Sequence, residues 1–113
     1  MSTMPPSIQT GRWLIETGPF DYNRMRLTMP GQIVWLTERQ GRLLAYLMQH
    51  PDRAISYDEL IRRVWGFESF TKSEEQLLSV VLHSLRRIID PQPPYRIITT
   101  VHKHLLLHSE LCQ

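Results

Sequence analysis

Cysteine and long apolar runs are almost absent from this sequence, and each absence excludes a class of protein. Cys112 is the only cysteine of the 113 residues, so the chain forms no internal disulfide and offers no multi-cysteine metal site. No stretch approaches the roughly 18 to 20 apolar residues that span a bilayer. The N-terminal residues lack the basic start and apolar segment of a secretion signal. These features favour one soluble domain in the reducing cytoplasm.

Neither positive nor negative charge is in large excess. The net charge is +2, and residues 1–60 carry equal numbers of acidic and basic groups. Residues 76–104 depart from this balance, since Asp90 is their only acidic residue. The basic residues of this segment are Arg86, Arg87, Arg96 and Lys103. A mild local excess of positive charge is consistent with contact to a small area of an anionic partner. An ordinary solvated surface would give the same composition.

Catalytic motifs are missing as well. The chain has no G-x-S-x-G, no glycine-rich phosphate loop and no H-E-x-x-H. Asp58 and Glu59 fit the start of a helix, where the helix dipole favours carboxylates, better than an acid–base pair. Cys112 stands next to the last residue, too near the end to be held as a nucleophile. We therefore expect no enzyme activity, no cofactor and no small-molecule substrate.

The N-terminal third has the pattern of short strands. The stretches "RWLIE", "RMRLTM" and "QIVWL" are separated by the turn-rich "TGPFDYN" and "PG". They predict three or four short antiparallel strands between Trp13 and Trp35. We expect residues 1–11 to be a flexible N-terminus and residues 110–113 a tail, which leaves residues 12–109 as the domain.

Three helices are predicted next. Thr37 and Gln40 have the spacing of a capping box, in which each side chain bonds the backbone N–H of the other residue. Ser56 and Glu59 have the same spacing, and a third start lies within residues 71–76. The predicted helices end at His50–Pro51, at Gly66 and at Ile89–Asp90. The residues that the first two helices should bury are Leu43, Leu44, Leu47, Met48, Leu60, Ile61, Val64 and Trp65.

The third helix has two different faces. At about 100° per residue, one broad stripe is apolar and must face the core: Leu77, Leu78, Val81, Leu82, Leu85, Ile88 and Ile89. The opposite face is centred on Gln76, His83 and Arg87 and flanked by Lys72, Ser79 and Val80, with Arg86 at the edge of the stripe. Polar side chains of this kind donate hydrogen bonds to base edges or phosphates, although a solvated face has the same pattern.

The C-terminal part predicts a β-hairpin. The β-prone runs "YRIITTV" and "LLLHSEL" lie on either side of His102-Lys103-His104. Two capped helices followed by a hairpin predict an α+β fold of the winged helix-turn-helix type. Its parts are a short N-terminal antiparallel sheet, three helices and a C-terminal hairpin wing.

These residues resemble a known family. The stretch "LTERQGRLLAYLMQHPDRAISYDELIRRVWG" resembles the first two helices of OmpR/PhoB-type winged helix-turn-helix DNA-binding domains. "LHSLRRIID" and "YRIITTV" match the third helix and the following strand of that family. "GRWLIE" is similar to the first strand of its membrane-anchored ToxR/CadC-like branch. The resemblance covers residues 10–108.

The resemblance implies a sequence-specific regulator of transcription in signal transduction, with a recognition helix at about residues 73–89 in the major groove and a wing at about residues 102–105. Base edges would be read by Gln76, Ser79, Val80, His83 and Arg87. The other residues expected at the double-stranded DNA are Lys72, Arg86, Thr100, His102, Lys103 and His104. The loop 66–72 matches the segment through which relatives meet RNA polymerase.

Two further expectations concern the whole protein. The few cations of the reading face predict weak binding by one copy, so a homodimer or tandem binding on DNA is expected. We expect no phosphorylated receiver domain ahead of the helices. With Met1 and the ToxR-like first strand, this suggests a stand-alone regulator or the N-terminal, cytoplasmic piece of a membrane-anchored one.

The predicted wing departs from the family pattern. Relatives carry glycines and an aromatic residue at the tip of the hairpin, whereas residues 102–106 here read "HKHLL". Apart from a histidine, which can tolerate positive φ, no residue suited to a tight turn is present, so we expect a longer, looser or differently shaped wing, with at least one of the leucines 105–107 exposed. His102, His104 and His108 would share a strand face, but no further ligand is evident, which argues against a metal site.

A winged helix that binds protein instead of DNA is the rival interpretation. Val80 on the reading face, the acidic pair Glu74–Glu75 near its start and the altered wing all favour it. Salt separates the two, because phosphate contacts weaken steeply with ionic strength and an apolar protein interface does not.

Overall fold

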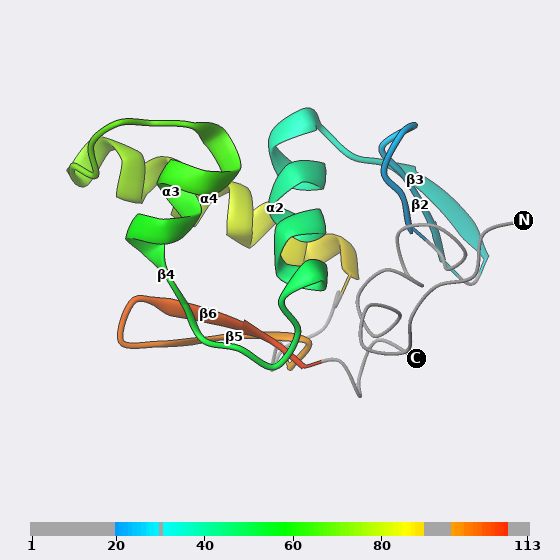
Figure 1. The fold of residues 1–113 in the computed structure, drawn as a ribbon. Coiled ribbons are helices and arrows are strands. Elements are labelled where there is room, and N and C mark those ends of the chain that lie inside the picture. Colours follow the sequence, from blue (N-terminus) through cyan, green and yellow to red (C-terminus); the bar gives the residue numbers. More distant parts are fainter. Residues whose placement is uncertain (1–19, 30, 90–95, 109–113) are drawn as a thin grey trace, which may run out of the picture.

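The computed structural model describes residues 20–29, 31–89 and 96–108. Its helices are α2 (Glu38–Gln49), α3 (Tyr57–Trp65) and α4 (Lys72–Ile89). Its strands are β1 (Phe20–Asp21), β2 (Arg26–Met29), β3 (Gln32–Trp35), β4 (Ile55–Ser56), β5 (Ile98–Val101) and β6 (His104–Leu107). The helices form the middle of the molecule, with β1–β3 beyond α2 at one end and the β5–β6 hairpin beneath α2 and α3 (Figure 1). The predicted α+β architecture is confirmed.

The N-terminal sheet has the order β1-β2-β3 and is antiparallel throughout. Leu27 of β2 pairs with Phe20 on one side and Val34 on the other, and Phe20 and Leu27 are buried. Ile33 and Trp35 alternate with Val34 along β3 and are exposed, as expected for a strand with one covered face. The predicted strand "RWLIE", the flexible N-terminus 1–11 and the tail 110–113 lie outside the described residues.

The predicted capping box is complete at the start of α2 and only half formed at the start of α3. At α2 both halves of the box are present: the Gln40 N–H donates to Thr37 Oγ1 and the Thr37 N–H donates to Gln40 Oε1. Such a cap is worth about 1 kcal/mol. At α3 the Glu59 N–H donates to Ser56 Oγ, but the Glu59 carboxylate accepts from Tyr46 Oη at 2.6 Å and from Arg53. The box predicted there is only half formed, because Tyr46 of α2 and Arg53 of the turn after it supply other donors to the carboxylate.

The end of α3 is made by a glycine in the left-handed region. Gly66 has φ 76° and ψ 18°, and its N–H donates to the Arg62 carbonyl, while the Phe67 N–H donates to the Ile61 carbonyl. The bond from Gly66 to Arg62 is the 5→1 link of the αL cap, which satisfies a carbonyl that the helix would otherwise leave unpaired. The chain then needs only residues 66–71 to reach α4, close to the predicted loop 66–72.

One apolar core joins the three helices to the hairpin. The predicted Leu43, Leu44, Leu47 and Met48 of α2 are buried, as are Leu60, Ile61 and Val64 of α3. Trp65 is not: it is only partly buried, because it lies at a groove between α2 and α4. From α4, the core takes Leu78, Val81, Leu82 and Leu85, while Leu77, Ile88 and Ile89 are partly buried at its margin.

The C-terminal sheet contains a strand that the sequence did not reveal. Its order is β4-β6-β5, and Ile55 of the short strand β4 pairs with Leu105. Leu105 and Leu107 are buried and Leu106 is partly buried. The prediction that at least one of these leucines is exposed is therefore wrong. Pairing with β4 on one side and β5 on the other places the alternate residues of β6 in the core.

The predicted longer or looser wing is also wrong. Val101 pairs with His104, so the hairpin closes through only His102 and Lys103. Both residues have positive φ, 50° and 58°, which is the geometry of a type I′ turn. A glycine is the usual solution there, and each L-residue costs roughly 1–2 kcal/mol in this region. The structure accepts that cost because the strands on either side are held by the core.

The turn generates a stability prediction. His102→Gly should raise the free energy of unfolding by about 0.5–1 kcal/mol, because glycine avoids the left-handed penalty and gives back part of the gain as chain entropy. The measurement is urea denaturation followed by circular dichroism.

Val101→Gly is the control, since Val101 lies in the extended strand β5 next to the turn. Glycine there should lower stability by about 0.5–1 kcal/mol. If the two variants were destabilised alike, the left-handed assignment of His102 would be incorrect.

Candidate nucleic-acid interface

The outer face of α4 is uncovered along most of its length. Its predicted residues Lys72, Gln76, Ser79, Val80, His83 and Arg87 are all exposed. Within the described part of the chain, the side chains of Gln76, His83 and Arg87 make no hydrogen bond or ion pair. The apolar stripe of α4 is turned inward, so these donors point away from the core. Nothing among the described elements has to move for an extended partner to reach them.

Arg86 has a different position from the rest of the predicted set. Its Nε donates to the Ile98 carbonyl at 3.0 Å, and its Nη2 donates to Thr100 Oγ1 at 2.5 Å. Both acceptors belong to β5, so the guanidinium ties α4 to the wing. Arg86 is partly buried, whereas Thr100 is exposed. The two residues therefore form one unit on the wing side of α4.

The wing tip is docked against two helices. The Tyr57 N–H at the start of α3 donates to the Lys103 carbonyl at 3.0 Å. Lys103 Nζ lies 3.0 Å from Glu75 Oε2 of α4. The ring of His104 turns back on the tip, with Nδ1 2.8 Å from the His102 carbonyl. An ion pair this exposed stabilises by about 0–1 kcal/mol, so the backbone bonds hold the wing and the ion pair orients its lysine.

Glu74, next to Glu75, serves the helix start. Its Oε1 accepts from the Thr71 N–H at 2.8 Å and also from the Thr71 hydroxyl. These hydrogen bonds lower the pKa of the Glu74 carboxyl below its ordinary value, because they favour the charged form. Thr71 is therefore the residue at which the third predicted helix starts, and the Glu74 carboxylate is the partner of Thr71.

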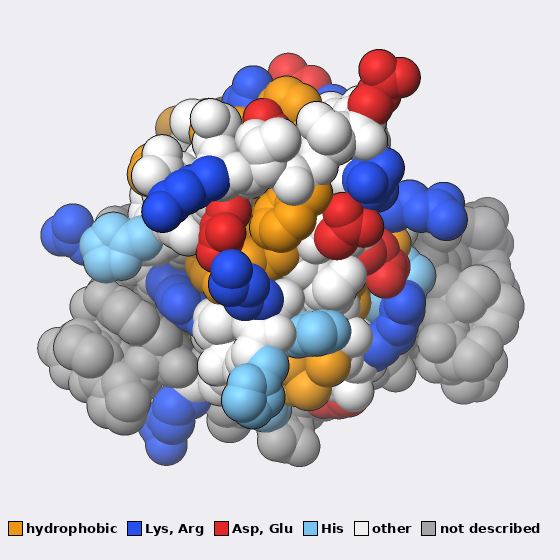
Figure 2. Space-filling model, turned by 90° about the vertical axis from the view of Figure 1, so that its left-hand side faces the viewer, with side chains coloured by type: hydrophobic (Ala, Val, Ile, Leu, Met, Phe, Trp, Pro, Cys, Tyr) orange, Lys and Arg blue, Asp and Glu red, His pale blue; other side chains and the backbone are white. Residues whose placement is uncertain are grey.

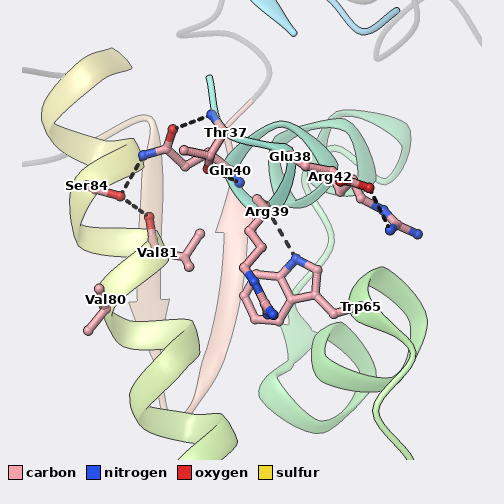
Figure 3. Close-up of a pocket in the computed structure, with 9 residues that line it drawn as sticks. All are labelled: Thr37, Glu38, Arg39, Gln40, Arg42, Trp65, Val80, Val81 and Ser84. Carbon is pink, nitrogen blue, oxygen red and sulfur yellow. Dashed lines mark hydrogen bonds and ion pairs between the residues drawn. The ribbon is translucent and has the colours of Figure 1, made fainter. Parts of the chain in front are cut away.

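A groove runs along the other flank of α4, between this helix and α2 (Figure 3). Gln40 Nε2 donates to Ser84 Oγ at 2.8 Å, and Ser84 Oγ donates to the Val81 carbonyl. On the opposite wall the Arg39 guanidinium lies 5.6 Å from the centre of the Trp65 ring. The remaining lining residues are Thr37, Glu38, Arg42 and Val80. The reading face of α4 therefore lies between two structured flanks, α2 and the wing.

The surface beside the wing tip is mixed in charge. Figure 2 shows basic, acidic and histidine side chains interspersed over this face, without a continuous basic patch. A second groove there is lined by the start of α4, the preceding loop and Lys103; its members include Phe70, Glu75, Gln76 and Ser79. Among the residues that the structure describes, no group of three His, Cys, Asp or Glu side chains is placed to hold a metal ion.

The fold and this surface match one family. A family model described as "Transcriptional regulatory protein, C terminal" matches residues 31–104, more than half of the chain. The chain belongs to this family. It is similar to the response regulator PhoP of Pseudomonas aeruginosa, with 28% identity over 101 residues, or 88% of this chain and 44% of that protein. It is also similar to the phosphate regulon regulator PhoB of Escherichia coli, with 32% identity over 60 residues, or 53% of this chain and 25% of PhoB.

Solved structures give the same result. The DNA-binding domain of Escherichia coli CadC superimposes with a TM-score of 0.64 and 25% identity, covering 76% of this chain and 80% of that domain. The C-terminal domain of the nisin resistance regulator NsrR gives 0.58 and 27%, covering 74% and 84%. The OmpR/PhoB-type winged helix fold is confirmed. The chain spans less than half the length of the curated relatives PhoP and PhoB.

Other contacts at this surface were missed from the sequence. Glu75 was identified only as part of an acidic pair near the start of the reading face, but it meets Lys103, 28 residues later. Gln40 was identified only as a capping residue, yet it also contacts Ser84, 44 residues away. No local spacing signals such pairs. In the described part of the chain, no helix has both the length and the apolar character needed to cross a lipid bilayer.

The two neighbouring arginines of α4 should respond differently to substitution. Arg86→Met should lower the free energy of unfolding by about 1–3 kcal/mol, because it removes two charge-assisted hydrogen bonds to β5. Arg87→Met removes the same charge from an exposed position and should change stability by less than about 0.5 kcal/mol. Urea denaturation of both variants measures the difference. Equal effects would show that the link from Arg86 to β5 contributes nothing.

Proposed function

We propose that this chain is a sequence-specific, double-stranded-DNA-binding domain of a transcriptional regulator. The observation that carries the proposal is the uncovered face of α4, whose central side chains Gln76, His83 and Arg87 have no partner within the described residues. CadC, whose DNA-binding domain has this fold, supports the same function. The helix enters the major groove, which admits an α-helix and presents a distinct donor and acceptor pattern for each base pair.

Base edges are read by the centre of the face and phosphates by its borders. Gln76, Ser79 and His83 supply hydrogen-bonding groups, and Val80, with 67% of its surface exposed, is an apolar contact for a thymine methyl group. Arg87 adds a guanidinium that reads a guanine edge, and Lys72 at the start of α4 meets a phosphate. The other strand of the DNA duplex is met by Thr100 and by the wing-tip residues His102, Lys103 and His104. Arg86 holds Thr100 in place.

Partners beyond DNA are part of the proposal. The chain offers few cations that are not already engaged, so one copy binds weakly and a pair of copies on adjacent sites binds well. The loop 66–71 projects between α3 and α4 and is the surface proposed for RNA polymerase. The place of action is the cytoplasm, where both DNA and polymerase are found. The proposed function requires no catalysis.

A protein-binding role is the second candidate, because Val80 is strongly exposed and Lys103 is paired with a carboxylate. Selection from a pool of random DNA duplexes separates the two. DNA binding predicts an enriched motif, arranged as a direct repeat, and an affinity that falls steeply as salt rises. A pool without enrichment, together with binding that is insensitive to salt, would support the protein-binding role.

Arg87 provides a sharper test. Arg87→Ala should weaken binding to every sequence and reduce the salt slope by about 1 if the guanidinium grips a phosphate. It should instead relax the preference at one base pair if the guanidinium reads a guanine. Gel-shift titrations at several salt concentrations distinguish these outcomes.

Arg24→Ala is the matched control, since Arg24 is exposed in the turn before β2 and pairs with Asp21. That variant should bind DNA as the parent does. Unchanged affinity and unchanged preference after Arg87→Ala would remove Arg87 from both roles.

A further inference from the structure

Two adjacent glutamates at the start of α4 have different surroundings. Glu74 is used by the helix, because its carboxylate accepts from Thr71. Glu75 is turned toward the wing, with Oε2 3.0 Å and Oε1 3.3 Å from Lys103 Nζ. Its side chain is 29% exposed and lines the groove shared with Gln76 and Ser79. Glu75 therefore lies within the reading surface rather than outside it.

A carboxylate at this position needs a donor from the DNA. Phosphates and the exposed acceptors of guanine and thymine repel it, and like charges brought together at an interface cost affinity. Cytosine presents a different edge, since its N4 amino group is a donor in the major groove. Glutamate accepts from that group, whereas glutamine pairs with adenine through N6 and N7. The carboxylate is thus suited to one base of the four.

Lys103 makes such a contact feasible. An ammonium group has three donors, so a lysine that touches both Glu75 oxygens keeps a further N–H for a phosphate. Its positive charge offsets the repulsion between Glu75 and the DNA backbone. The backbone of Lys103 is anchored, because its carbonyl accepts from the Tyr57 N–H and the turn contains only two residues. The wing therefore places an ammonium group beside the carboxylate.

We propose that Glu75 reads a cytosine at one position of the DNA site, and that Lys103 is the positioning residue that holds its carboxylate in the groove. This inference deepens the proposed DNA-binding function and rests on it. It assigns a base preference to a residue that would otherwise only oppose binding. It also gives the ion pair between wing and helix a role in specificity.

The experiment compares the parent chain with Glu75→Gln and Glu74→Gln in selections from one random duplex pool. Glu75→Gln should lose the cytosine preference at a single base pair by about tenfold and gain adenine there, with the other positions unchanged. Glu74→Gln removes the same charge one residue away and preserves the capping geometry, because glutamine also caps at this position. It should keep the parent motif.

Lys103→Met tests the positioning role. It should weaken the cytosine preference at the same base pair, and the double variant with Glu75→Gln should show no additional loss of preference there. The readout is the ratio of affinities for duplexes that differ only at that base pair, which a purely structural lysine would not change. Uniform loss of affinity with an unchanged ratio would overturn the positioning role.

The outcomes distinguish a failure of the Glu75 assignment from a failure of the proposed DNA-binding function. If the parent enriches no motif, the proposed DNA-binding function itself fails. If the parent enriches a motif and Glu75→Gln leaves every position unchanged, or changes all affinities equally, only the Glu75 assignment fails. Glu75→Asp is the second variant should Glu75→Gln fold poorly: it keeps the charge, shortens the reach, and should lose the cytosine preference without gaining adenine.

Discussion

Four buried side chains determine which face of α4 the molecule presents, and the candidate interface depends on them. Leu78, Val81, Leu82 and Leu85 lock into the core formed with α2, α3 and the hairpin. Burying an aliphatic side chain of this size stabilises by about 1.5–3 kcal/mol, so turning the helix by one residue would cost far more than any surface contact returns. The exposed face of α4 carries Gln76, His83 and Arg87 because the four apolar residues hold the opposite face in the core.

The wing depends on the same core through β6. Leu105 and Leu107 are buried and β4 pairs with β6 on the side away from β5, so the hairpin is anchored to the core. The turn of His102 and Lys103 tolerates positive φ because its ends are fixed on both strands. Arg86 and Glu75 then attach the wing to α4 at two points. Helix and wing consequently form one connected surface.

Much of this arrangement could be predicted from the sequence. Periodicity identified the three helices and nearly all of their core residues, and the spacing of Thr37 and Gln40 identified a complete capping box. These features are local, because they arise from residues within a few positions of each other. The outward set on α4 follows from the same periodicity and is exposed as predicted.

The features that escaped prediction depend on distant neighbours. The strand β4 has only two residues and exists because β6 lies beside it. Glu59 was assigned to a cap, but Tyr46 from another helix offers it a stronger donor. The wing was expected to be loose because it lacks glycine, and local turn preference was overridden by the packing of its strands. Sequence periodicity carries no information on any of these encounters.

The contact between Gln40 and Ser84 has a mechanical consequence. Gln40 receives the Thr37 N–H immediately after β3 and passes a hydrogen bond on to Ser84, which donates to the backbone of α4 (Figure 3). The junction between the first sheet and α2 is thereby coupled to the middle of α4. A sideways displacement of α4 by a bent or widened duplex would strain that junction directly. The N-terminal sheet β1–β3 would therefore respond to the shape of a duplex bound to α4.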